Sequence, residues 1–217
     1  YIVSQNGSIY ALDVATGAVN WKSQTDGLIF GSPTVDSGRI YIANDRGIVF
    51  GMRADNGTIL WRSDVEGGVF APIVSAGDTL YVTTAAGTTF ALSAEFGSTT
   101  WKYDAGGSGG AALGEDVVIV AADDGSVSAI DRESGAITWS VATGAQITVG
   151  PTISGDIVLV ASGQTLYAYD VETGSQVFTY ATGNTIQIPP IAVNGLVLVG
   201  GRDGYLDAIA GDQASET

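Results

Sequence analysis

Short apolar runs separated by turn-forming residues follow one another along the whole chain, and this pattern indicates β-strands rather than helices. Residues 27–66 contain four such runs, GLIFGSPTV, RIYIA, IVFGMR and TILWRSDV, separated by DSG, NDRG and ADNG. The second run of each unit is continuously apolar, as in RIYIA, TLYVT and VVIVA. A strand without polar alternation has both of its faces covered. We therefore predict four-stranded sheets that pack face to face.

Aromatic residues recur at a fixed distance and set the period of the chain. The successive spacings are 40, 40, 38 and 39 residues, through Trp21, Trp61, Trp101, Trp139 and Phe178. A glycine stands four residues before each aromatic, at Gly17, Gly57, Gly97, Gly135 and Gly174. Four strands in a period of about 40 residues predict an all-β chain, a β-propeller of four-stranded antiparallel blades around an axis.

The repeat divides a single domain into six units and a short tail. Their approximate bounds are 1–26, 27–66, 67–105, 106–144, 145–183 and 184–211, with 212–217 as the tail. The first unit opens on a second strand and the last closes on a third, so about five and a half blades are present. One interpretation is a fragment of a larger ring. The other is a ring of five or six blades whose terminal strands pair across the gap, which would remove exposed edges.

The units share a string, A-x-D-x-x-T-G-x-x-x-W, which resembles the tryptophan-docking motif of the PQQ-like (quinoprotein-type) propeller repeat. The string is best preserved from Ala11 to Trp21, whereas Arg53 and Ser93 replace its aspartate in the second and third units. Unit six stops at Asp212 without its tryptophan. The resemblance covers essentially the whole chain and implies a ring of seven or eight blades.

The motif also has a mechanical interpretation. The glycine closes a tight turn at positive φ, the acid accepts N–H bonds within that turn, and the aromatic covers a neighbouring sheet. We therefore assign a structural role to Asp13, Gly17, Trp21, Gly57, Trp61, Gly97, Trp101, Asp131, Gly135, Trp139, Asp170, Gly174 and Phe178. Loss of Trp21 is expected to cost less stability than loss of Trp61, because a partial blade is expected beside it.

Charge and composition exclude several classes of function. The chain has 23 Asp and Glu against 8 Lys and Arg, a net charge of −15, and 45% hydrophobic residues, so it is expected to fold and not to bind nucleic acid. It has no His and no Cys, which removes disulfides, ordinary zinc sites and Ser-His or Cys-His nucleophile pairs. The apolar runs are of strand length, so direct membrane insertion is not expected.

The acids are expected to concentrate on one end of the blades, where the motif turns and the first-to-second-strand loops lie. Thirteen of the 23 fall there, namely Asp13, Asp36, Asp55, Asp78, Glu95, Glu115, Asp116, Asp131, Glu133, Asp156, Asp170, Glu172 and Asp212. This surface is either a solvated skin or a patch for a basic partner. With only two lysines beside so many acids, the surface also resembles that of a salt-adapted protein.

Candidate binding residues lie toward the other end and near the axis. One register, nine residues after each aromatic, is predicted to ring the mouth of the central channel, at Phe30, Phe70, Gly110, Thr148 and Gln187. Second-to-third-strand turns contribute the rim residues Arg46, Asp123, Asp124 and Arg202. These polar residues are explained by hairpin chemistry or by oxygen ligation of a ligand or Ca²⁺. The glycine-rich segment from Gly106 allows either close packing or ligand approach.

The resemblance implies family members of two kinds. Some are binding modules, such as the outer-membrane assembly lipoprotein and sensor domains of membrane kinases, and others are PQQ-dependent dehydrogenases. We favour an extracytoplasmic, non-catalytic scaffold that binds a protein partner and needs no cofactor. The alternative is a fragment of an oxidoreductase that binds PQQ and Ca²⁺. Against it, the resembling dehydrogenases have adjacent cysteines and a tryptophan floor under the cofactor, and this chain has no Cys and no spare Trp.

Overall fold

The computed structural model describes residues 1–210 as six antiparallel sheets, and no helix that could cross a membrane occurs among these residues. The first sheet has three strands, β1 (Ile2–Val3), β2 (Ser8–Leu12) and β3 (Val19–Gln24). The second comprises β4 (Thr34–Asp36), β5 (Arg39–Ala43), β6 (Ile48–Arg53) and β7 (Ile59–Asp64). The third comprises β8 (Val74–Ala76), β9 (Thr79–Thr83), β10 (Thr89–Ser93) and β11 (Thr99–Tyr103).

Two more four-stranded sheets and a last three-stranded one complete the series. The fourth sheet comprises β12 (Ala111–Leu113), β13 (Val117–Ala121), β14 (Ser126–Asp131) and β15 (Ile137–Ala142). The fifth comprises β16 (Thr152–Ser154), β17 (Ile157–Ser162), β18 (Thr165–Asp170) and β19 (Gln176–Ala181). The sixth has β20 (Ile191–Val193), β21 (Leu196–Gly200) and β22 (Leu206–Ala210). The predicted all-β propeller architecture is confirmed.

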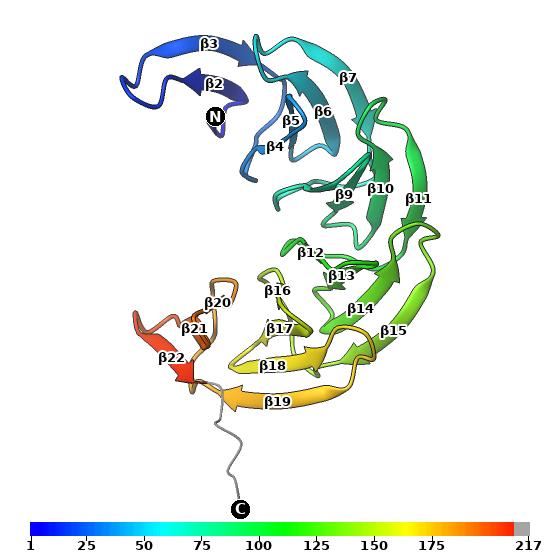
Figure 1. Ribbon diagram of the computed structural model, residues 1–217, viewed down its shortest axis with the longest axis vertical. Helices are drawn as coiled ribbons and strands as arrows, with labels where there is room; N and C mark the ends of the chain where they lie inside the picture. The colour runs from blue at the N-terminus through cyan, green and yellow to red at the C-terminus, as the bar shows by residue number, and fades with distance from the viewer. Residues whose placement is uncertain (211–217) are drawn as a thin grey trace, which may run out of the picture.

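The six sheets stand side by side along an open arc, with the first and last sheets at its two ends (Figure 1). Strands of the first sheet pair only with one another, and so do those of the sixth, within residues 1–210. The alternative in which the terminal strands pair to close a smaller ring is therefore wrong for this structure. The curvature set by the five sheet-to-sheet contacts leaves the ends apart.

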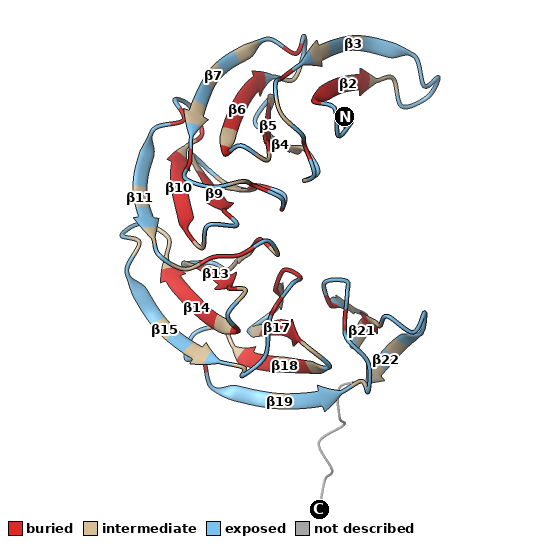
Figure 2. Cartoon of the chain, turned by 180° about the vertical axis from the view of Figure 1, so that it is seen from behind, coloured by how far each residue is buried: buried red, intermediate tan, exposed pale blue. Residues whose placement is uncertain are grey.

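The core consists of five apolar layers, each lying between two consecutive sheets. Alternation along a strand explains this arrangement, because successive side chains point to opposite faces. On β5, Ile40 and Ile42 pack toward the first sheet with Phe50, whereas Tyr41 packs toward the third sheet with Leu80. The second and third strands are consequently buried on both faces, while outer strands such as β7 and β19 are exposed along much of their length (Figure 2).

The innermost strands are shorter than the sequence predicts. The run GLIFGSPTV is expected to form one strand, but only Thr34–Asp36 is a strand in the structure. Pro33 has no N–H to donate to a ladder. The residues before it form individual hydrogen bonds in place of a strand ladder. The Ile29 N–H donates to the Gln5 carbonyl, 3.2 Å away, and the Leu28 N–H donates to the Asp45 carboxylate. These segments therefore line the inner side of the arc as ordered loops.

Candidate functional site

The repeated aromatics lie between sheets, each against the turn of the following sheet. The indole N–H of Trp61 donates to the carbonyl of Ala94 at 3.2 Å, and Trp101 donates to Arg132 at 3.0 Å. Trp21 and Trp139 make the same bond at 3.0 and 2.8 Å, to Ala54 and Val171. The neighbour of Trp21 is thus the complete second sheet. The expectation that Trp21 lies beside a partial blade is wrong, since the contacts run toward the following sheet.

Each tryptophan covers a glycine whose backbone only glycine adopts easily. Gly97 has φ of 72°, and a Cβ added to it would lie 2.4 Å from Cε3 of Trp61. Gly57, Gly135 and Gly174 meet the preceding tryptophan in the same way, with closest approaches of 2.6, 2.8 and 2.6 Å. Gly17 shares the φ of 72° but has no atom within 4 Å of the added Cβ. The glycines therefore combine a turn requirement with a stacking requirement.

A tyrosine accompanies the tryptophan at three of these boundaries, and sequence reasoning missed it. The hydroxyls of Tyr1, Tyr41 and Tyr81 donate to the same carbonyls as Trp21, Trp61 and Trp101, at 3.0, 3.3 and 3.4 Å. The paired rings lie 5.8, 6.0 and 5.8 Å apart, centroid to centroid. The signal was present as a tyrosine 20 residues before each tryptophan in three units. It points to one shared acceptor per boundary.

The turn aspartates hold their own turns closed. Asp131 Oδ1 accepts the N–H of Ser134 at 2.8 Å and also the Ser134 hydroxyl. Asp13 and Asp170 bind Thr16 and Thr173 in the same manner. These side-chain hydroxyl bonds, followed by the N–H bonds, lower the pKa of Asp13, Asp131 and Asp170. The carboxylates are thus stabilised in the charged form by the turns that they cap.

We expect these turns to weaken in acid. A carboxyl whose pKa is lower in the folded chain stabilises it above its unfolded pKa, about 4, and loses that contribution as pH falls through the folded value. Asp131→Asn should therefore reduce the loss of stability between about pH 4 and pH 2, measured by urea unfolding at each pH. Glu133→Gln is the control, because Glu133 belongs to the same turn and its carboxylate forms no hydrogen bond within residues 1–210. Equal pH profiles for Asp131→Asn and the parent chain would contradict this role.

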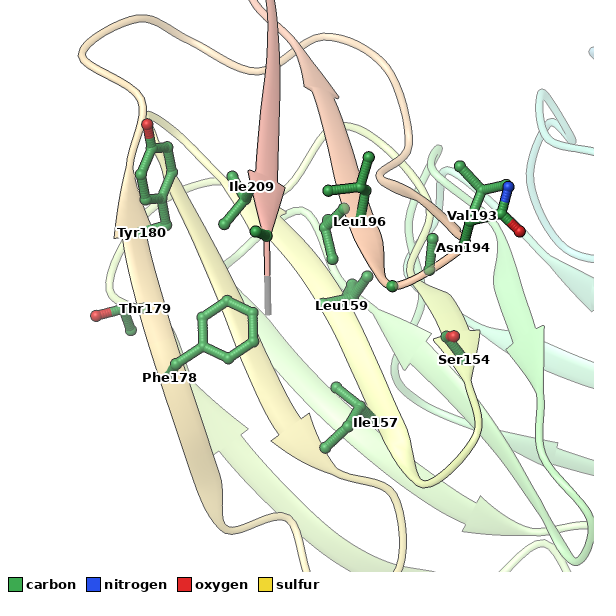
Figure 3. Close-up of a pocket in the computed structure, with 14 residues that line it drawn as sticks. Ser154, Ile157, Leu159, Phe178, Thr179, Tyr180, Val193, Asn194, Leu196 and Ile209 are labelled. Carbon is green, nitrogen blue, oxygen red and sulfur yellow. The ribbon is translucent and has the colours of Figure 1, made fainter. Parts of the chain in front are cut away.

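Phe178 occupies the fifth aromatic position and borders an open apolar groove. Its ring points into the groove among Ile157, Leu159 and Ile209, as Figure 3 shows. The groove encloses about 540 Å³ between the fifth and sixth sheets, and Ala192 to Val197 form its other wall. Phenylalanine has no N–H to donate, so the carbonyl bond of the other boundaries has no donor here. The sixth motif turn, which would begin at residue 211 and include Asp212, lies outside the described residues.

Of the five residues predicted at the channel mouth, the structure brings two into direct contact. The rings of Phe30 and Phe70 lie 5.4 Å apart at an interplanar angle of 51°. Both remain exposed, at 46% and 38%, although Ile29 and Val69 beside them are only 2% exposed. Thr148 and Gln187 are also exposed in the same register, while Gly110 is buried against Ala71. The register therefore presents an aromatic pair on one side and polar side chains on the other.

The predicted rim residues lie on the turns between second and third strands. Asp124 accepts both the N–H and the hydroxyl of Ser126, and these bonds lower its pKa. Asp123 accepts the N–H of Ser108 at 3.2 Å, as Asp45 accepts that of Leu28 at 2.8 Å. Arg46 and Arg202 form no ion pair within residues 1–210 and are exposed. The side chains of Asp123 and Asp124 thus accept hydrogen bonds from nearby residues, whereas those of Arg46 and Arg202 form no ion pair within residues 1–210.

Glycines of the inner segments allow adjacent sheets to approach closely. A Cβ on Gly150 would lie 2.4 Å from the Gly109 carbonyl oxygen, and one on Gly31 would lie 2.6 Å from the Ala71 carbonyl oxygen. These contacts favour the packing interpretation of the glycine-rich segment from Gly106. Side chains at Gly31, Gly109 or Gly150 would push neighbouring inner loops apart.

Acids gather in a groove between the fourth and fifth sheets, at the end of the blades that carries the motif turns. The groove encloses about 610 Å³, and its lining includes Glu115, Asp116, Asp156, Asp170 and Glu172. No group of three or more carboxylates within residues 1–210 is arranged to hold a metal ion. Three ion pairs occur in the same range, at 2.6, 3.9 and 3.7 Å, all exposed. Apart from Asp26, Asp55 and Glu66, the acids within residues 1–210 therefore form no ion pair.

We expect stability to rise with salt, because screening reduces repulsion between these acids. The melting temperature should increase between about 0.1 and 2 M NaCl as the Debye length shortens. A variant with Glu115→Gln, Asp116→Asn, Asp156→Asn and Glu172→Gln should respond less steeply, which separates screening from general salting-out. A melting temperature that stays flat or falls with NaCl would contradict the prediction.

Comparison with known proteins supplies the family. The model described as "Outer membrane protein assembly factor BamB" matches residues 1–68, 45–153 and 123–216. BamB from Moraxella catarrhalis has 23% identity and a TM-score of 0.82 over 95% of this chain and 68% of its own. The computationally designed Ika8 protein has 16% identity and a TM-score of 0.85 over 95% of this chain and 66% of its own.

A dehydrogenase shares the fold as well. Quinohemoprotein alcohol dehydrogenase from Comamonas testosteroni has 15% identity and a TM-score of 0.72, over 85% of this chain but 41% of its own. No curated protein matches the sequence. At these identities the solved structures establish the fold alone, whereas the family model spans nearly the entire sequence. The chain belongs to the PQQ-like repeat family described as outer membrane protein assembly factor BamB.

Proposed function

We propose that this chain is a non-catalytic, extracytoplasmic scaffold that binds a protein partner. The observation that carries the proposal is the exposed contact between Phe30 and Phe70, which projects from two complete, well-packed sheets. Interface hot spots are enriched in aromatic side chains held by a rigid scaffold. The family description as an assembly factor supports the same function, and with it a location outside the cytoplasm.

The alternative is a PQQ- and Ca²⁺-dependent oxidoreductase, and the residues of this chain do not fit that cofactor. All four tryptophans are already held between sheets by bonds to backbone carbonyls, so none is available to stack under a quinone. The rim acids Asp45, Asp123 and Asp124 accept bonds from backbone N–H groups of the adjacent inner loops or of their own turn, and no group of three or more acids within residues 1–210 is arranged to hold a metal ion. We therefore derive no reaction step through PQQ.

The test combines partner capture with a cofactor test. The chain, carrying a photo-crosslinking residue in place of Thr148, is incubated with a cell-envelope extract, and the crosslinked protein is identified, purified and titrated by calorimetry. A saturable complex with the purified partner is the expected result. PQQ with Ca²⁺ should leave the melting temperature unchanged, since only a ligand of the folded state raises it. A rise of many degrees, with dye-linked alcohol oxidation, would overturn the proposal.

A further inference from the structure

We propose that the Phe30–Phe70 pair anchors an extended, basic segment of a partner protein through an aromatic or large apolar side chain of that segment. This inference rests on the proposed scaffold function and specifies the chemistry of the partner at one site. The pair is defined here as the two rings, 5.4 Å apart, on the inner loops of the second and third sheets.

The pair is held in place before any partner arrives. The backbone on either side of the rings is bonded to neighbouring turns: Val69 N–H donates to the Asn44 carbonyl at 3.0 Å, and Asp45 N–H donates to the Leu28 carbonyl at 2.9 Å. Asn44 itself is fully buried, and its side chain bonds to the backbone of Asp26, Arg46 and Ile48. Little backbone entropy therefore remains to be lost at this site on binding.

The rings are exposed because their neighbours are buried, not because the loop lacks packing. Ile29 and Val69 pack into the layers between sheets, while Phe30 and Phe70, the next residues on the same loops, remain exposed. Leu28 adds further apolar surface, at 46% exposure. Covering aromatic surface with an apolar side chain is favourable, and two tilted rings offer both an edge and a face to a third.

Charge determines which segment fits. The chain has a net charge of −15, and six of its eight basic side chains are already engaged. Arg53, Arg62 and Lys102 form ion pairs, Arg39 and Arg132 donate to carbonyls, and Lys22 lies over Tyr10. Asp26 and Glu66, which stand four residues before Phe30 and Phe70 on the same loops, are the acids of the pairs with Arg62 and Lys102. Lysines or arginines that flank the anchoring side chain would be attracted by the net negative charge that the remaining acids give the chain, whereas a nucleic acid would be repelled.

Arg46 allows the charge of the bound segment to be tested. It lies on the turn whose backbone borders Phe70, because the Asp45 carbonyl and the Phe70 ring both lie within 3.0 Å of a Cβ added to Gly68. A basic segment is repelled by Arg46 and an acidic segment is attracted to it. Arg46→Gln should therefore tighten binding of a basic segment and weaken that of an acidic one.

The probe is a fluorescein-labelled nonapeptide of lysine and glycine with one central tryptophan, followed by fluorescence polarisation against the full chain. One comparison peptide has serine in place of tryptophan, and a second has glutamate in place of every lysine. We expect the lysine–tryptophan peptide to bind most tightly. Equal affinity for the serine peptide, or tighter binding of the glutamate peptide, would overturn the proposal.

Variants of the chain locate the site. Phe30→Ser combined with Phe70→Ser should raise the Kd of the lysine–tryptophan peptide at least about tenfold, and Arg46→Gln should lower it. Phe96→Ser is the matched control, because Phe96 is 69% exposed but lies on a motif turn at the other end of the blades. Melting curves verify that each variant is folded, and Phe30→Leu with Phe70→Leu serves as a milder pair. Unchanged affinity in both double variants would overturn the proposal.

Failure of this inference differs from failure of the scaffold function. If the purified partner binds the Phe30→Ser, Phe70→Ser double variant as tightly as the parent chain, the anchor assignment is wrong and the scaffold function stands. If no partner forms a complex and PQQ stabilises the chain, the scaffold function itself is wrong.

Discussion

Replacement of Trp61 by alanine should lower the free energy of unfolding by about 3–5 kcal/mol, the range for large aromatic truncations in packed interiors. The indole packs against the layer between the second and third sheets. Its loss removes that contact and leaves a void. The Ala94 carbonyl would not be orphaned, because Tyr41 and Arg39 also donate to it, at 3.3 and 2.8 Å. The cost is therefore mainly one of packing.

Urea unfolding monitored by circular dichroism measures this cost. Tyr41→Phe is the matched control, because it removes one donor from the same carbonyl and leaves the ring, and we expect about 1 kcal/mol. Little destabilisation by Trp61→Ala and Trp101→Ala, together with quenching of either indole by a small ligand, would place these tryptophans in a binding site instead.

Gly97→Ala should destabilise the fold by about 2–5 kcal/mol for two separate reasons. The φ of 72° costs an alanine about 1–2 kcal/mol. The new methyl group would also lie 2.4 Å from Trp61, and relieving such overpacking typically costs about 1–3 kcal/mol. Urea unfolding again supplies the measurement.

Gly17→Ala separates the two contributions. Gly17 has the same φ of 72°, but no atom lies within 4 Å of an added Cβ, so only the backbone cost of about 1–2 kcal/mol should appear. In a double-mutant cycle, the cost of Gly97→Ala should fall toward that of Gly17→Ala once Trp61 is alanine, since the obstructing ring is gone. Additive effects of Trp61→Ala and Gly97→Ala would show that the two residues do not press on one another.

The repeat of tryptophan and glycine sufficed to predict the architecture, because a fixed period fixes how many strands a blade can hold. The direction of the contact could not be predicted, since the spacing from Gly57 to Trp61 is the same whether Trp61 faces the preceding sheet or the following one. That ambiguity produced the wrong neighbour for Trp21. Likewise, Pro33 could have signalled that the innermost strand of its sheet begins only at Thr34, but the apolar residues before it favoured a longer strand.

The candidate site was predicted in part. The register of Phe30 and Phe70 is visible in the sequence, but their contact depends on the curvature of the arc, which no local pattern records. The tyrosines escaped notice because their strand is apolar throughout, so Tyr41 is difficult to distinguish from a simple core residue. The groove at Phe178 arises from the absence of a covering element within residues 1–210, and a sequence does not reveal what leaves a side chain uncovered.

The five separate layers of the core determine how the molecule opens. Among residues 1–210, none belongs to more than one layer, so each boundary between sheets is expected to open with its own local free energy. Amide exchange should then be graded along the arc, fastest in β20–β22, where Phe178 supplies no N–H, and slowest in the second and third sheets. A partner that grips Phe30 and Phe70 would thus hold the part of the arc that opens least often, and the outermost sheet could fray without releasing it.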